Sequence, residues 1–88
     1  MELAINIFQR NLSFKLHNKV GDNLDDLITV SSKEKITSII LSGESRSYTF
    51  LRQIALFCNL TAELNDCEII LKTKSYVKMD KSIAPIYE

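Results

Sequence analysis

The residues able to carry out chemistry are few and widely spaced. His17 is the only histidine, and it lies between Lys15 and Lys19, where a solvated side chain is the simplest expectation. Cys58 and Cys67 lack the C-x-x-C spacing of a zinc or redox site. The sequence also has no glycine-rich phosphate loop, nucleophile elbow or paired-carboxylate signature. We therefore predict that the chain is not an enzyme and has no catalytic residue, metal site or cofactor.

A small acidic cluster, Asp22, Asp25 and Asp26, offers the oxygen ligands that calcium prefers. It lacks the spacing and the closing glutamate of a calcium-binding loop. Helix capping explains it better, because Asn23 or Asp22 can accept a hydrogen bond from a first-turn amide and acidic residues suit the positive end of a helix dipole. The cluster therefore predicts a short helix that carries Leu24, Leu27 and Ile28.

Composition limits the kind of protein. A chain of 88 residues is expected to form one small domain rather than a two-domain enzyme with an enclosed cleft. Eleven basic and eleven acidic residues give zero net charge, which argues against a surface that binds nucleic acid indiscriminately. Two cysteines are too few for a disulfide framework. We expect a cytoplasmic protein with no signal peptide, no membrane span and no small-molecule substrate.

The first third of the chain fits two kinds of secondary structure. Phe8, Leu12, Leu16 and Val20 recur at helical spacing, which predicts a helix over residues 4–18. Many of the same residues also alternate with a period of two, which is typical of a β-hairpin over residues 2–17. We favour the helix and keep the hairpin as the alternative.

The middle of the chain predicts two further helices. Ser31 and Ser32 can cap a helix from about residue 33 to residue 42, and Gly43 follows where a helix commonly ends. After a polar turn, apolar residues at helical spacing predict a helix over residues 48–59. Its expected core residues are Phe50, Leu51, Ile54, Ala55, Phe57 and Cys58.

The character changes after residue 66. In the segment "CEIILKTKSYVKM", apolar and polar residues alternate and β-branched residues are frequent, which predicts a strand or a bent hairpin. Such a strand needs a partner in this chain or in a second copy. The residues from Asp80 onward are expected to form a flexible tail.

The order of short helix, turn, helix and following helix resembles the phage-repressor-type helix-turn-helix domain, also called Cro-like, lambda-repressor-like or XRE-type. The residues that carry the resemblance are "FQRNLSFKL", "NLDDL", "SSKEKITSIILSG" and "SRSYTFLRQIALFCNLTAEL". They include Leu41-Ser42-Gly43 and the pair Ile54-Ala55. The resemblance implies a mainly α fold: a lambda-repressor-like helical bundle with a C-terminal strand or hairpin.

The resemblance also implies sites and partners. Members of the family act as dimeric transcriptional regulators on double-stranded operator DNA. The role of base contact falls on Lys33, Glu34, Lys35 and Ser38, and that of phosphate contact on Ser32, Arg46 and Tyr48. Residues 1–64 would form the DNA-binding domain, residues 65–79 a dimerisation strand and residues 80–88 the flexible tail.

A second hypothesis belongs to a different class of protein. With the N-terminal hairpin in place of the first helix, the chain would be a small α+β module that binds another protein, as an inhibitor or adaptor does, without binding DNA. Zero net charge favours this hypothesis, because neutralisation of phosphates dominates affinity for DNA.

Overall fold

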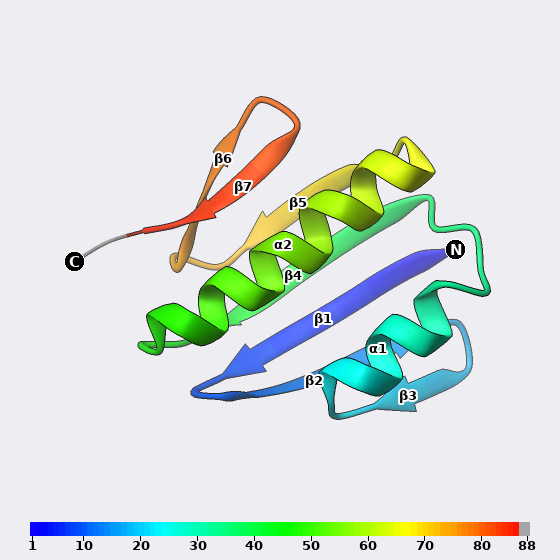
Figure 1. Ribbon diagram of the computed structural model, residues 1–88, viewed down its shortest axis with the longest axis horizontal. Helices are drawn as coiled ribbons and strands as arrows, with labels where there is room; N and C mark the ends of the chain where they lie inside the picture. Colours follow the sequence, from blue (N-terminus) through cyan, green and yellow to red (C-terminus); the bar gives the residue numbers. More distant parts are fainter. Residues whose placement is uncertain (87–88) are drawn as a thin grey trace.

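The computed structural model describes residues 1–86, which form seven strands and two helices. In chain order they are β1 (Glu2–Phe8), β2 (Asn11–Leu16), β3 (Lys19–Gly21), α1 (Leu24–Ser31), β4 (Ser38–Glu44), α2 (Tyr48–Asn65), β5 (Glu68–Lys72), β6 (Tyr76–Met79) and β7 (Ser82–Pro85). Five strands form a sheet in the order β3-β2-β1-β4-β5, and β6 pairs with β7 beside it (Figure 1).

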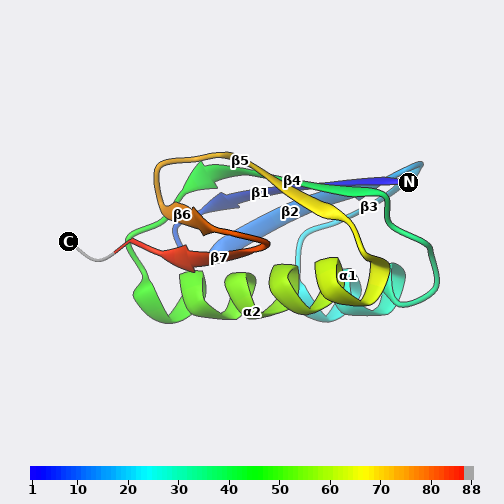
Figure 2. The same cartoon turned by 90° about the horizontal axis from the view of Figure 1, so that it is seen from above.

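The molecule has two main layers. Both helices lie on the same side of the five-stranded sheet, and no helix covers its other side among the described residues (Figure 2). The hydrophobic core fills the space between the layers. Its fully buried members are Leu3, Ile5, Ile7, Leu16, Leu27, Ile36, Ile39, Leu41, Ile54, Cys58 and Ile69.

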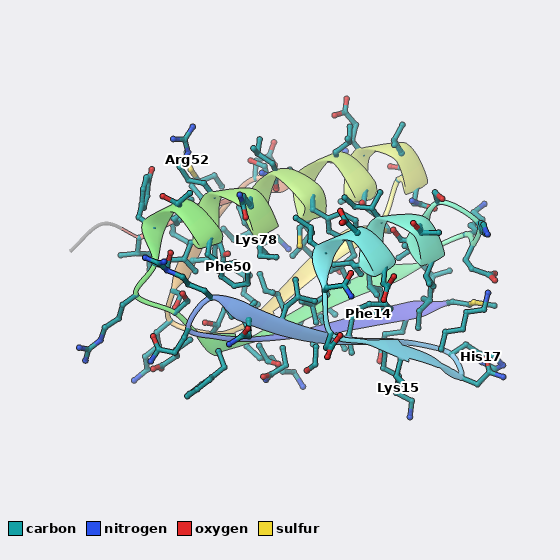
Figure 3. The ribbon with its side chains drawn as sticks, turned by 60° about the horizontal axis from the view of Figure 1, so that its bottom comes forward. Phe14, Lys15, His17, Phe50, Arg52 and Lys78 are labelled. Carbon is teal, nitrogen blue, oxygen red and sulfur yellow. The ribbon has the colours of Figure 1, made fainter. Side chains whose placement is uncertain are left out.

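The prediction of a mainly α helical bundle is wrong, since the fold is α+β with a mixed sheet at its centre. In place of the helix over residues 4–18, residues 2–16 form the antiparallel hairpin of β1 and β2, as the alternative prediction had it. The reason is burial: Leu12, Phe14 and Leu16 are buried while the residues between them are exposed. Figure 3 shows Phe14 directed toward α1 and Lys15 directed away from it. This alternation belongs to a strand with one covered face.

The helix predicted over residues 33–42 is also wrong. Residues 33–37 connect α1 to the sheet, and β4 then runs between β1 and β5, parallel to both. Ile39 and Leu41 enter the core while Ile40 is only half-buried, which is a period of two. β-Branched isoleucines suit this pleated environment better than they suit a helix.

Gly43 therefore does not end a helix. It lies inside β4 with a φ of 94°, a conformation that favours glycine. A Cβ atom at this position would lie 2.0 Å from the carbonyl oxygen of Ile7 in β1. The absence of a side chain thus lets the backbones of β1 and β4 approach each other closely.

Three other predicted elements are confirmed. The short helix is α1, and its N-cap is Asn23, whose side-chain oxygen accepts from the backbone N–H of Asp26 at 2.8 Å. The last predicted helix is α2, which begins at Tyr48 as expected and continues to Asn65. The strand predicted after residue 66 finds its partner within the chain, because β5 pairs with β4.

The segment predicted as a flexible tail contains β7, and its residues 87–88 lie outside the described part of the chain. The hairpin of β6 and β7 is fastened to α2. Tyr76 of β6 donates its hydroxyl to the backbone carbonyl of Leu51 at 2.8 Å. The side chain of Asn59 in α2 bonds the backbone of Ile83 in β7 twice, at 2.8 and 3.0 Å.

The two outer edges of the large sheet differ in how they are protected. On one side β3 has only three residues. On the other side Lys78 of β6 donates to the backbone carbonyl of Ile69 in β5 at 3.0 Å and to the carboxylate of Glu68 at 3.3 Å. Short strands and lysine side chains both hinder the pairing of a sheet edge with another chain.

Candidate protein interface

The helix α2 presents an apolar surface away from the core. It starts at its N-cap Ser47, whose hydroxyl accepts from the backbone N–H of Phe50, and it ends at Asp66 in the left-handed conformation. One face of the helix packs on the sheet. The buried residues of that face are Leu51, Ile54, Ala55, Cys58, Thr61 and Ala62.

Three leucines occupy the opposite face of α2, which we call the leucine face: Leu56, Leu60 and Leu64. Their side chains are 67%, 59% and 76% exposed. Leu60 follows the buried Leu51 by nine residues, which at about 100° per residue places it about 180° from the core side. Leu56 and Leu64 lie about 40° to either side of Leu60, so the three side chains form one line along the helix.

Charge is almost absent from this helix. Arg52 and Glu63 are its only charged residues, and none stands among the ten residues between them. Figure 3 shows Arg52 directed away from the sheet while Phe50 is directed toward it. The Arg52 guanidinium carbon lies 5.9 Å from the ring centre of Tyr48. A helix that is apolar on both faces is expected to be covered on both.

The uncovered side of the sheet is built differently. One row of side chains across it is polar and comprises Ser13, Asn6, Ser42 and Lys72 in neighbouring strands. The amide of Asn6 donates to the hydroxyl of Ser42 at 3.0 Å. A second polar row comprises Glu2, Ser38 and Glu68. Between the two rows lies a less polar one of Lys15, Ala4, Ile40 and Ile70, in which Ile40 is half-buried and Ile70 is 37% exposed. Two of these three rows are polar, so most of this side suits contact with water.

A cleft of about 1020 Å³ opens where β1 and β4 end and α2 begins. Its lining includes Phe8, Glu44, Arg46, Tyr48 and Lys74. This is the edge at which open parallel sheets commonly bind ligands. Aromatic, basic and acidic side chains are mixed there, however, so that the lining does not select one class of ligand.

The serines at the cleft are used by the fold. The hydroxyl of Ser45 donates to the carbonyl of Gln9 at 2.5 Å and accepts from the backbone N–H of Ser47 at 3.1 Å. The backbone N–H of Ser45 in turn donates to the hydroxyl of Ser75 at 3.3 Å. These bonds hold the connections from β1, β4 and β5 together, and Ser47 caps α2 as described above.

The residues predicted to contact DNA bases lie at one end of β4. Lys33, Glu34 and Lys35 belong to the connection between α1 and β4, and Ser38 is the first residue of β4. Glu34 forms an ion pair with Lys19 at 3.5 Å. No helix presents these side chains together, because the helix on which the prediction was based is absent from the described residues.

The residues predicted to contact phosphates do not join them in one place. Ser32 ends α1, and its hydroxyl donates to the carbonyl of Thr29 at 2.8 Å. Arg46 and Tyr48 lie beyond the other end of β4, where Arg46 is exposed in a loop and Tyr48 is the first residue of α2. The predicted contact residues are thus divided between opposite ends of the sheet.

Neither cysteine is poised as a nucleophile. Burial, with a smaller contribution from Cys67, raises the pKa of the Cys58 thiol to about 12. Burial and the nearby Asp66 also raise the pKa of Cys67. A thiol must lose its proton to attack a substrate, so both shifts oppose nucleophilic chemistry at neutral pH. Within residues 1–86, no group of three or more His, Cys, Asp or Glu side chains is placed to hold a metal ion.

The comparisons with known proteins leave the geometry as the basis for assigning a function. No protein-family model, curated protein or solved structure matches this chain. Among the described residues, no helix has the length and apolar character needed to span a membrane. The leucine face is therefore the feature of the surface that most needs a functional explanation.

Sequence reasoning had missed this face. The prediction for α2 used its apolar periodicity to find the core and stopped there. The signal was present, because Leu56, Leu60 and Leu64 are spaced four residues apart on the side opposite Leu51 and Ile54. A helix with one apolar stripe needs one surface packed against it, whereas two apolar stripes on opposite sides indicate two packed surfaces.

Proposed function

We propose that this chain is a small α+β protein-interaction module that acts by binding, as an adaptor or inhibitor does. Its docking surface is the leucine face of α2. The observation that carries the proposal is the line of three exposed leucines on a helix with only two charged residues, Arg52 before the line and Glu63 on its flank. A cytoplasmic location, with both thiols reduced, belongs to the same proposal.

The energetic argument rests on apolar area. Removing a leucine side chain from water contributes about 1.5–3 kcal/mol when burial is complete. Leu56, Leu60 and Leu64 retain most of their exposed area in the single chain, so most of that gain is still available to a partner. Contiguous apolar patches of this kind on soluble proteins commonly mark interaction sites.

DNA binding by a transcriptional regulator stays a prediction. The division of its predicted contact residues between opposite ends of β4, together with zero net charge, favours the interaction module as the function to test first. A gel-shift series on the chain's own promoter DNA would address this alternative. Salt-dependent binding that weakens in Lys35→Ala and Arg46→Ala would support the regulator and count against the interaction module.

Photocrosslinking tests the proposed docking surface directly. A photoreactive amino acid at position 60 is expected to give a covalent protein adduct of defined mass in the cells from which the chain comes. The matched control carries the same group at Ser13, which is exposed on the uncovered side of the sheet. Adducts from both positions alike, or none from position 60, would contradict the proposal.

A further inference from the structure

We infer that the leucine face binds a second copy of this chain, with the two α2 helices antiparallel about a two-fold axis beside Leu60. This inference rests on the proposed function and names the partner of its docking surface. In this arrangement Leu60 of each copy faces Leu60 of the other, and Leu56 faces Leu64. The line of leucines is symmetric about Leu60, so it fits its own copy without an unmatched end.

The two charges of α2 complement each other in the same arrangement: Arg52 precedes the leucine face, and Glu63 stands on its flank between Leu60 and Leu64. Arg52 stands eleven residues before Glu63, so the two side chains lie about 20° apart around the helix and about 17 Å apart along it. Both therefore stand on one flank of α2. This is the flank of Asn59, which bonds β7.

A two-fold axis perpendicular to α2 reverses the direction of the helix in the second copy. It also leaves the flank that carries Arg52 and Glu63 on the same side of the dimer in both copies. Arg52 of each copy is then placed opposite the acidic end of the other helix, where Glu63 and the C-cap Asp66 stand. If the helices were parallel, the flank that carries Arg52 and Glu63 would instead face the uncharged flank of the second copy. Neither Arg52 nor Glu63 would then meet a charge of the opposite sign. Antiparallel helix dipoles favour the same choice.

The other route to self-association in an α+β fold is hindered. Copies of a sheet protein can pair through exposed strand edges, but β3 has only three residues and Lys78 occupies the outer carbonyl of Ile69 in β5. The uncovered side of the sheet carries the polar rows described above. The leucine face thus remains as a line of three well-exposed apolar side chains that a second copy can cover.

The affinity is expected to be moderate. A contact between two helices of this length is small compared with the interfaces of obligate dimers. We therefore expect a reversible dimer that dissociates at micromolar concentrations. Analytical ultracentrifugation of the purified full chain over a concentration series is the first measurement, and a monomer at every concentration would overturn the inference.

Substitution at the axis tests the position of the interface. Leu60→Glu would place two carboxylates against each other in an apolar contact, and we expect association to weaken by at least about 100-fold. The matched control is Val20→Glu in β3, which makes the same kind of change at a residue that is 73% exposed. Circular dichroism checks that both variants remain folded. Equal weakening by both variants, or by neither, would overturn the inference.

Charge reversal tests the pairing of the flanks. Arg52→Glu and Glu63→Arg are each expected to weaken the dimer by about 3- to 10-fold, as is usual for partly exposed ion pairs. The double variant is expected to recover most of that loss, because the two charges are exchanged together. If the double variant instead shows the sum of the two losses, the charges do not meet across the axis.

Disulfide trapping distinguishes antiparallel from parallel helices. In a Cys67→Ser background, copies with Leu56→Cys mixed with copies carrying Leu64→Cys are expected to form mixed disulfide dimers under mild oxidation. Each variant alone is expected to form few, whereas parallel helices would give the reverse result and overturn the inference. If the purified chain is monomeric and position 60 crosslinks to a different protein in cells, the second copy is excluded while the proposed function stands.

Discussion

Two large surfaces of this protein face away from its core, and they are made of opposite kinds of residue. On the uncovered side of the sheet, polar side chains bond one another, as Asn6 does with Ser42. On the outward side of α2, three leucines form a line, and the one charge within their span is Glu63 on the flank of that line. The chain places polar rows where the sheet meets water. The leucines on α2 therefore indicate a surface that contacts a partner protein.

The largest expected difference is between the two faces of α2. Ile54→Ala removes a fully buried side chain, and we expect the free energy of unfolding to fall by about 2–5 kcal/mol. Leu60→Ala is expected to change it by less than about 0.5 kcal/mol in the monomer. Urea unfolding at high dilution measures both. If Leu60→Ala costs as much as Ile54→Ala, the leucine face belongs to the fold rather than to a partner.

The dependence of stability on alkaline pH tests whether water is excluded from the inner face of α2. In the folded chain the pKa of Cys58 is raised from 9.0 to about 12, because burial disfavours the thiolate. Between these values the unfolded chain releases the proton while the folded chain retains it, so stability is complete below about pH 9 and falls above it. Burial also raises the pKa of Tyr76, which acts in the same direction.

Urea unfolding at a series of alkaline pH values measures this loss of stability. Cys58→Ala should make the dependence on pH shallower, although it lowers stability at every pH by removing a buried side chain. An unchanged dependence on pH in this variant would show that Cys58 is hydrated in the native state.

A smaller effect is expected where α2 begins. Ser47→Ala removes the N-cap hydroxyl that accepts from the backbone N–H of Phe50, and such a change costs about 1 kcal/mol. The cap acts on the helix backbone, so dimerisation should change little in comparison with Leu60→Glu. Thermal unfolding and ultracentrifugation of the same sample measure the two effects separately.

The smallest expected effect on monomer stability comes from placing leucines on the uncovered side of the sheet, as on the outward side of α2. Asn6→Leu combined with Ser42→Leu removes both partners of the hydrogen bond between these side chains, and the backbone carbonyl of Ile5 loses only the long 3.3 Å bond from the Ser42 hydroxyl. We expect stability to change by less than about 1 kcal/mol, but the new apolar patch beside Ile40 should cause association through the sheet. Light scattering measures this, and an unchanged mass would weaken the comparison between the two surfaces.

Some elements of the fold could be predicted from the sequence because their signals are local. Asn23 caps α1 through its own side chain, and α2 shows a helical period over many residues. The strand after residue 66 was recognised by alternation. For β1 and β2 the sequence was ambiguous, because residues four apart, such as Leu12 and Leu16, share a face in a strand as well as in a helix.

The distinction between the two possibilities depends on distant contacts. Leu3 lies beside Ile39 and Ile7 beside Gly43, so β1 and β4 specify each other across the intervening hairpin and helix. Local propensity does not contain this information. The candidate base contacts failed to assemble for the same reason, since they were assigned to a helix over residues 33–42, and residues 38–42 pair with β1 instead. The leucine face could have been found from sequence, but only by asking which side of α2 was already covered.

The hydrogen bond from Lys78 to the carbonyl of Ile69 has a consequence for how copies of the chain would assemble. A bare strand edge recruits one chain after another and has no natural end, which is how fibres grow. A contact between two helices about a two-fold axis buries the same surface in both copies. No such surface is left for a third copy, so the assembly ends at a dimer. By occupying the carbonyl of Ile69 in β5, this lysine hinders the addition of a strand there and so favours an assembly of finite size.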